Sequence, residues 1–144
     1  MRGITLCCLT AGLLLLSGCS SSEPTVTGLV QVDGEPLARG SISFVPMDDK
    51  GAVARDRGPG GGSPIAEGKY QIAKGLTIGR YRVEIQGTRK TGKKIRDPIF
   101  RSDLVDEEVD VVPEKYYKNS ILIKEVHAGA QTIDFPLEGI KKGK

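Results

Sequence analysis

The sequence predicts an all-β protein, a β-sandwich of about seven strands. Apolar residues recur at every second position in several short stretches, and a chain with 19 glycines and 8 prolines has many residues suited to turns between them. No amphipathic helix of convincing length is visible. Alternation turns one face of each strand toward a core, and two sheets packed face to face would bury those faces.

The first predicted strand covers residues 26–32, where valines alternate with other side chains. The next four residues, Asp33-Gly34-Glu35-Pro36, have turn chemistry, because glycine accepts a positive φ and proline fixes its own. A second strand is expected over residues 41–45, ending at Pro46.

The stretch after the second strand is rich in glycine. Residues 52–54 are expected to form a short edge strand, and the sequence RGPGGGS at 57–63 is expected to be a flexible hairpin loop. A phosphate-binding loop would need a lysine, then Ser or Thr, after its last glycine and a helix behind it. Here Ser63-Pro64 follow instead, which argues against that function.

Four more stretches read as strands by the same alternation. They lie at residues 70–72, 81–85, 120–126 and 133–137. Tyr70 and Tyr81 are expected in or beside the core, since a tyrosine ring is large and apolar while its hydroxyl can reach a partner. Residues 127–130 form a tight connection between the last two strands.

The long connection at residues 88–119 is sharply divided by charge. Its first half is basic, with Arg89, Lys90, Lys93, Lys94, Arg96 and Arg101, and its second half is acidic, with Asp103, Asp106, Glu107, Glu108, Asp110 and Glu114. One interpretation is a solvated loop whose halves partly neutralise each other. Another makes the basic residues from Arg89 to Arg96 a contact surface for anionic glycans or lipid headgroups. A Ca²⁺ site in the acidic half is a weaker alternative, because the spacing does not match an EF-hand loop.

The amino end has the layout of an export signal. Arg2 precedes an apolar run over residues 4–16, which is too short to be a resident membrane span. The run ends in Leu16-Ser17-Gly18-Cys19, which resembles the lipobox of bacterial lipoproteins. The resemblance implies a signal peptide over residues 1–18 and an acylated Cys19 that becomes the new amino terminus, followed by a tether over 19–24. An ordinary secretory signal that contains a cysteine is the alternative.

The implied anchor has consequences for location. Two or more acyl chains hold a protein durably on a membrane, so the mature chain would be membrane-bound without a spanning helix. We therefore expect a lipid-anchored protein of the cell envelope. A serine directly after the cysteine, here Ser20, resembles the pattern of lipoproteins that are sent to the outer membrane. In a host with two membranes we therefore expect the outer membrane.

Composition argues against several function classes. Loss of the signal removes Arg2 alone from the 21 Lys and Arg residues, which then nearly balance 18 acidic residues, and this argues against a nucleic-acid partner. It also removes Cys7 and Cys8. With Cys19 acylated, no thiol is left for a disulfide, a metal or catalysis. His127 is the only histidine, and no hydrolase or zinc motif accompanies it, so we expect no enzyme activity, cofactor or metal.

Three longer stretches carry a family resemblance. TGLVQVDGEPLARGSISFVP, AEGKYQIAKGLTIGRYRVEI and VPEKYYKNSILIKEVHAGAQTIDFPLEG resemble bacterial lipoproteins with a carboxypeptidase regulatory-like domain, similar to the transthyretin-like (prealbumin-like) β-sandwich. The resemblance implies one such domain over residues 25–140. Ile78 departs from the family pattern, which usually has proline there. The shared motifs specify a scaffold and contain no catalytic set.

These observations predict a non-catalytic envelope lipoprotein whose β-sandwich displays loops to a partner. The partner is the membrane through the lipid anchor, with an envelope protein or a polysaccharide as the further contact. A glycan-binding module for cell-surface polysaccharide is the alternative, and an accessory role within an envelope assembly is a third. The sequence does not choose among them.

Overall fold

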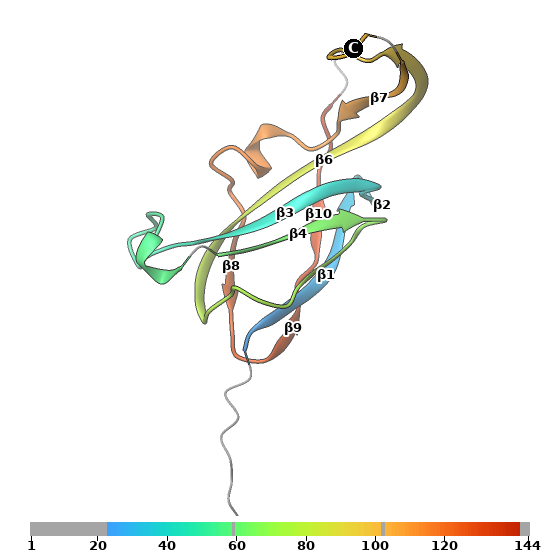
Figure 1. Cartoon of the computed structure of the whole chain (residues 1–144). Coiled ribbons are helices and arrows are strands. Elements are labelled where there is room, and N and C mark those ends of the chain that lie inside the picture. The colour runs from blue at the N-terminus through green and yellow to red at the C-terminus, as the bar shows by residue number, and fades with distance from the viewer. Residues whose placement is uncertain (1–22, 59, 102, 142–144) are drawn as a thin grey trace, which may run out of the picture.

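The computed structural model describes residues 23–58, 60–101 and 103–141 and contains strands joined by turns and two short 3₁₀ segments (Figure 1). The strands are β1 (Thr25–Val32), β2 (Glu35–Pro36), β3 (Arg39–Pro46), β4 (Gly61–Ala66), β5 (Lys69–Ile72), β6 (Gly79–Arg96), β7 (Leu104–Asp110), β8 (Ile123–Val126), β9 (Ala130–Thr132) and β10 (Phe135–Leu137). The 3₁₀ segments are η1 (Arg55–Arg57) and η2 (Glu114–Tyr116). The predicted all-β sandwich is confirmed, with ten strands, several of them short, where about seven were expected.

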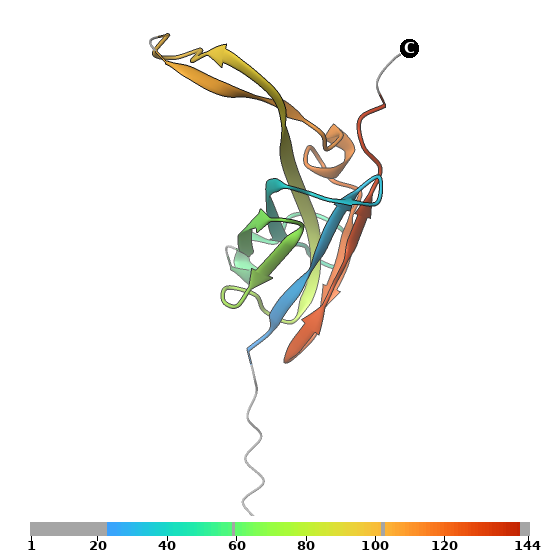
Figure 2. The same ribbon diagram turned by 90° about the vertical axis from the view of Figure 1, so that its right-hand side faces the viewer.

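The strands form one hydrogen-bonded sheet that folds over on itself. The order along its main path is β10-β1-β5-β4-β3-β6-β7, while β8 also pairs with β6, and β2 and β9 pair with β1. Most pairs are antiparallel, but β9 and β10 run parallel to β1. Figure 2 shows that the hairpin of β6 and β7 leaves the sandwich and extends beyond it.

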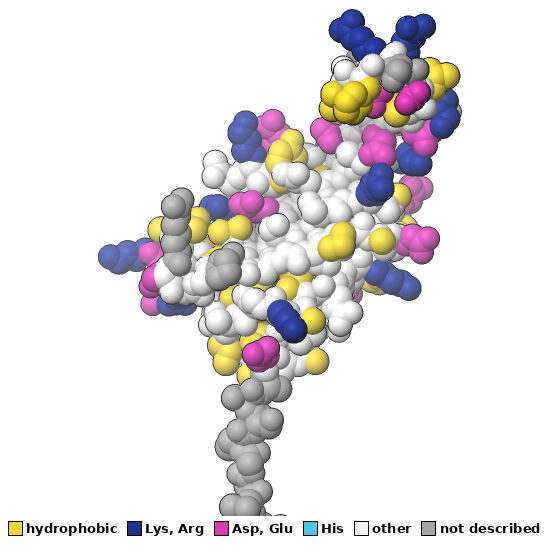
Figure 3. Space-filling model, in the orientation of Figure 1, with side chains coloured by type: hydrophobic (Ala, Val, Ile, Leu, Met, Phe, Trp, Pro, Cys, Tyr) yellow, Lys and Arg dark blue, Asp and Glu magenta, His cyan; other side chains and the backbone are white. Residues whose placement is uncertain are grey.

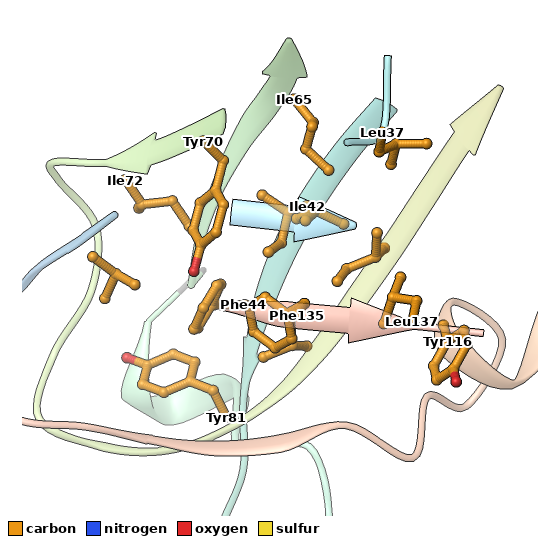
Figure 4. Close-up of a cluster of buried hydrophobic side chains, with 14 of the residues drawn as sticks. Leu37, Ile42, Phe44, Ile65, Tyr70, Ile72, Tyr81, Tyr116, Phe135 and Leu137 are labelled. Carbon is orange, nitrogen blue, oxygen red and sulfur yellow. The ribbon is translucent and has the colours of Figure 1, made fainter. Parts of the chain in front are cut away.

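The core of the sandwich centres on four aromatic rings (Figure 4). Phe44 on β3 packs against Tyr70 on β5, Tyr81 on β6 and Phe135 on β10, with ring centroids 6.5, 6.0 and 6.3 Å away. Because β3 and β10 are far apart in the strand order, the contact between Phe44 and Phe135 joins the two layers of the sandwich. Such tilted and edge-to-face pairs suit the charge distribution of aromatic rings.

The hydroxyl groups of both core tyrosines form hydrogen bonds with nearby backbone groups. The Tyr81 hydroxyl accepts the Thr77 N–H at 2.9 Å and donates to the Thr77 carbonyl at 3.0 Å. The Tyr70 hydroxyl donates to the Ile133 carbonyl at 2.7 Å. Burial, helped by the negative charge of Asp134, raises the pKa of Tyr70, so its hydroxyl keeps the proton it donates. The predicted core position of both rings is confirmed.

The turn predicted after the first strand is present. Asp33 and Gly34 have φ of 52° and 84°, the left-handed pair typical of a tight hairpin turn between β1 and β2. The Asp33 carboxylate also accepts the N–H of Gly139 at 2.9 Å. This hydrogen bond ties the chain after β10 to the turn.

The prediction of a flexible loop over residues 57–63 is wrong for its second half. Gly61, Gly62 and Ser63 belong to β4 and pair with β3. Glycine is needed for this close packing, because a Cβ on Gly61 would lie 2.7 Å from Ile72 Cγ2. The predicted edge strand over 52–54 is reduced to one bridge between Met47 and Val53.

The last two predicted strands are present in shortened form. The stretch 120–126 becomes strand only from Ile123, and the run 133–137 is strand only at β10. Within the described residues no helix has the length and apolar character needed to cross a membrane.

Candidate contact surface on a hairpin arm

The segment expected to be a long connection is largely a β-hairpin. Strand β6 loses its partner β3 after the pair Arg39 and Thr88, yet it continues for eight more residues, and β7 returns antiparallel along it. We call residues 89–101 and 103–110 the hairpin arm. Every residue of β6 beyond Thr88 is exposed, so the arm is a two-stranded ribbon outside the core.

A bulge lies midway along the arm. Lys90 pairs with Glu108 and Lys94 with Asp106, so three residues of β6 oppose the single residue Glu107. Gly92 supplies the positive φ of 83° that this irregularity requires, and the Thr91 hydroxyl donates to the Glu107 carboxylate at 2.6 Å. A bulge bends its strand and increases its twist, and Figure 1 shows the arm curving beyond the sandwich.

The arm ends in a turn that presents apolar side chains to solvent. We call residues 97–101 together with residues 103 and 104 the arm tip. The Asp97 carboxylate accepts the N–H groups of Ile99 and Phe100 at 2.7 and 2.8 Å, which fixes the backbone of the turn. Ile99 and Phe100 are nevertheless 79% and 77% exposed, and Leu104 is 66% exposed. Figure 3 shows hydrophobic side chains gathered with Lys and Arg side chains at the end of the arm.

One face of the arm is held together by opposite charges. Asp106 accepts a hydrogen bond from Lys90 at 2.7 Å and pairs with Lys94 at 2.6 Å. These hydrogen bonds and charges lower the pKa of the Asp106 carboxyl to about 2. Nearer the sandwich, Glu108 accepts from the Thr88 hydroxyl at 2.8 Å and from Arg39 at 3.2 Å, and these contacts lower its pKa.

The opposite face of the arm continues the core-facing side of the sandwich. Tyr81, Val83 and Ile85 point into the core from alternate positions of β6, and the same alternation leads to Arg89 on the arm. Directly across from Arg89 lies Val109.

Farther out on this face, Ile95 lies across from Val105. The side chains of Ile95 and Val109 are 39% and 40% exposed. A broken apolar stripe therefore runs from the sandwich toward the arm tip.

The apolar stripe leads into a groove at the foot of the arm. This base groove has a volume of about 440 Å³ and lies between the turn after β1, the foot of the arm and the chain after β10. Val32, Leu37, Val109, Val111 and Ile140 supply its apolar lining. Asp33, Glu35 and Asp110 add three acidic side chains to the lining, against the single base Arg89.

The predicted contact residues are therefore divided between different surroundings. Lys90 and Lys94 are brought together on Asp106, as the interpretation of mutually neutralising halves predicts. Arg89 lines the base groove on the other face. Lys93 lies in the bulge and Arg96 at the last position of β6, and within the described part of the chain neither takes part in an ion pair.

Sequence reasoning missed the apolar part of this surface. The run at residues 103–111 stands out for its acidic residues, although Val105, Val109 and Val111 share its odd-numbered positions. That period of two is the signal of a strand with one apolar face. Ile99 and Phe100 escape notice in the same way because charged residues surround them.

The described residues give no structural support for a catalytic histidine or a Ca²⁺ site. His127 is exposed in the turn between β8 and β9. Among residues 23–58, 60–101 and 103–141, no group of three or more His, Cys, Asp or Glu side chains is arranged to hold a metal ion. The acidic residues considered for Ca²⁺ include Asp106 and Glu108, whose carboxylates bind basic or hydroxyl side chains instead. Cys19 and the signal peptide lie outside the described residues.

Comparison of the chain with models of protein families, with curated proteins and with solved structures finds no match in any of the three. Within the described residues, the hairpin arm is the feature that most distinguishes this fold from a plain β-sandwich.

Proposed function

We propose that this protein is a non-catalytic lipoprotein of the cell envelope, anchored through Cys19, whose β-sandwich holds the hairpin arm out as a contact surface. The observation that carries the proposal is the exposed apolar tip formed by Ile99, Phe100 and Leu104 at the end of a hairpin that extends beyond the sandwich. A cluster of large apolar side chains on the protein surface marks a site of protein or membrane interaction. The resemblance to carboxypeptidase regulatory-like lipoproteins is part of this proposal.

The two ends of the molecule support a division between anchoring and contact. The N–H of Thr25, at the start of β1, binds the Gly129 carbonyl, close to where Val126 pairs with Gly79 at the start of β6. The tether therefore joins the sandwich at the end where β6 begins. The arm tip lies at the other end of β6, whose 18 residues would span at most about 60 Å at about 3.3 Å per residue.

The tether is short compared with that span. Between Cys19 and Thr25 lie residues 20–24, which reach at most about 18 Å when fully extended. An acylated Cys19 would hold the sandwich next to its membrane and leave the arm free to project or to lie along the surface. In both cases the tip is available to a partner beyond the anchored end.

The anchor is tested separately from the partner. In cells that make the full chain, Cys19→Ser is expected to abolish acylation and to leave the protein soluble or unprocessed, as measured by fractionation and mass spectrometry of the amino-terminal peptide. Ser20→Ala is the matched control and keeps the lipid. A wild-type protein that is processed, soluble and unmodified at Cys19 would contradict the anchor.

The partner is tested by purification from the native envelope. Wild-type protein is expected to retain an envelope component that Phe100→Ser loses, while Ile78→Ser, a change at an exposed position in the turn before β6, keeps it. The glycan-binding alternative stays a prediction that a glycan array decides. Reproducible glycan binding at moderate salt, unaffected by Phe100→Ser, would favour that alternative.

A further inference from the structure

We propose that the base groove of one molecule receives the arm tip of a second copy of this chain, which gives an antiparallel two-fold dimer. The inference rests on the proposed function, because it takes the arm as a contact surface and names its partner. It is carried by three features of the arm and the groove: matching apolar surfaces, opposite charge and reciprocal geometry.

The arm tip and the base groove both present apolar side chains. The arm tip offers Ile99, Phe100 and Leu104, which are all more than 60% exposed. The base groove offers about 440 Å³ lined mainly by aliphatic side chains. Seating the tip in the groove removes both surfaces from water at once, which is the main driving force for protein association.

The charges of the two surfaces are opposite. The outer part of the arm, residues 90–101 and 103–106, carries five basic side chains against three acidic ones: Lys90, Lys93, Lys94, Arg96 and Arg101 against Asp97, Asp103 and Asp106. The lining of the base groove carries Asp33, Glu35 and Asp110 against Arg89. An antiparallel pair of arms brings each basic tip onto an acidic groove, whereas a parallel pair would place like charges together.

The geometry is reciprocal, as a two-fold interface requires. The tip and the base groove lie at the two ends of the same arm. The six residue steps of β7 from Leu104 to Asp110 separate them by about 20 Å at about 3.3 Å per residue. A two-fold axis through the middle of two antiparallel arms places the tip of each copy on the base groove of the other. The exposed stripe of Ile95, Val105 and Val109 then faces its own copy along the overlap.

A second copy also accounts for the existence of the arm. A two-stranded ribbon on its own is only marginally stable in water, and this one has no third strand beyond Thr88 among the described residues. A partner arm against its apolar face would supply the missing layer. An anionic membrane would explain the basic and apolar tip but leave the base groove without an occupant.

Cysteine cross-linking in the native envelope tests the dimer with the full-length chain. Two differently tagged forms are produced together, one with Phe100→Cys and the other with Ile140→Cys, which places a thiol at the base groove. Mild oxidation is expected to yield a mixed disulfide dimer. The matched control replaces Ile140→Cys by Ile78→Cys, an exposed isoleucine in the turn before β6, and the expected yield is at least fivefold lower. The parent chain with only its natural cysteines gives the background.

Three outcomes are informative. A strong Phe100–Ile140 cross-link that Ile95→Glu reduces to the control level supports the dimer. A yield equal to the Ile78 control overturns it, and if envelope proteins are still retained through Phe100, the displayed arm stands while its second-copy partner is wrong. Binding of the Cys19→Ser chain to phosphatidylglycerol vesicles that is lost in Phe100→Ser, without the cross-link, overturns the dimer in favour of a membrane contact.

Discussion

Lys90 donates a hydrogen bond of 2.7 Å to Asp106, which lies 16 residues later in the chain. This contact joins the basic and acidic halves of the hairpin arm. The outer part of β6 has little apolar alternation, so burial contributes little to its pairing with β7. Cross-strand pairs of opposite charge, such as this one, stabilise the pairing of the two strands instead.

Asp106 is predicted to make the arm sensitive to acid. Its pKa is lowered from 3.8 to about 2 in the folded protein, so the ionised carboxylate stabilises the arm above about pH 4, and this stabilisation declines as the pH falls toward 2. Carboxyl NMR titration is expected to give a midpoint near 2, and the pairing of β6 with β7 should weaken over the same range. Asp106→Asn should lack this transition. A midpoint at the ordinary aspartate value would contradict the two hydrogen bonds.

Two phenylalanines separate scaffold from display surface. Phe135 is 1% exposed against Phe44 and Tyr70, so Phe135→Ala should lower the free energy of unfolding by about 3–5 kcal/mol. Phe100 is 77% exposed, and Phe100→Ala should change it by less than about 0.5 kcal/mol. Urea denaturation of both variants measures the difference. Equal losses of stability would show that the arm tip is part of the folded core.

Tyr81→Phe tests the turn that leads into β6. The change keeps the buried ring but removes the hydroxyl that binds both backbone groups of Thr77. A hydrogen bond contributes about 0.5–1.5 kcal/mol to stability, and we expect a loss in that range by thermal or urea unfolding. Tyr117→Phe, at a half-buried tyrosine outside this turn, is the comparison. A Tyr81→Phe protein as stable as wild type would remove the structural reason for a tyrosine at this position.

Charge reversal distinguishes the two lysines beside the bulge. Lys94→Glu replaces the partner of Asp106 with a like charge and should loosen the arm, seen as weaker nuclear Overhauser effects between β6 and β7. Lys93→Glu should leave the arm intact but weaken association with its partner, most strongly at low salt because exposed charges are screened beyond about 8 Å at physiological ionic strength. Neither change should alter the stability of the sandwich by more than about 1 kcal/mol. If Lys93→Glu leaves every association unchanged, the basic side chains are only solvated.

Much of the sandwich could be predicted from the sequence because its strands bury one face. Alternation identified the stretches 26–32 and 81–85, and turn chemistry located Asp33-Gly34. The start of β4 is not predicted, because glycine is depleted in strands. Glycine is present at position 61 because the backbone there packs closely against Ile72 and Leu76.

The contact surface was harder to predict. The basic residues were recognised, but their pairing is long-range: Lys90 and Lys94 meet Asp106 only because β7 folds back along β6. The base groove combines the turn after β1, the foot of the arm and the chain after β10, which no local pattern connects.

The central claim, that the exposed arm tip is the contact surface of an envelope-anchored scaffold, is tested most directly by quantitative purification of the full-length chain from its native envelope. Wild type, Phe100→Ser and Ile78→Ser are compared at equal protein levels. The account predicts that wild type and Ile78→Ser retain at least one envelope component and that Phe100→Ser retains at least tenfold less of it. A second tagged copy of the chain counts as such a component. Identical sets of retained components for all three proteins would contradict it.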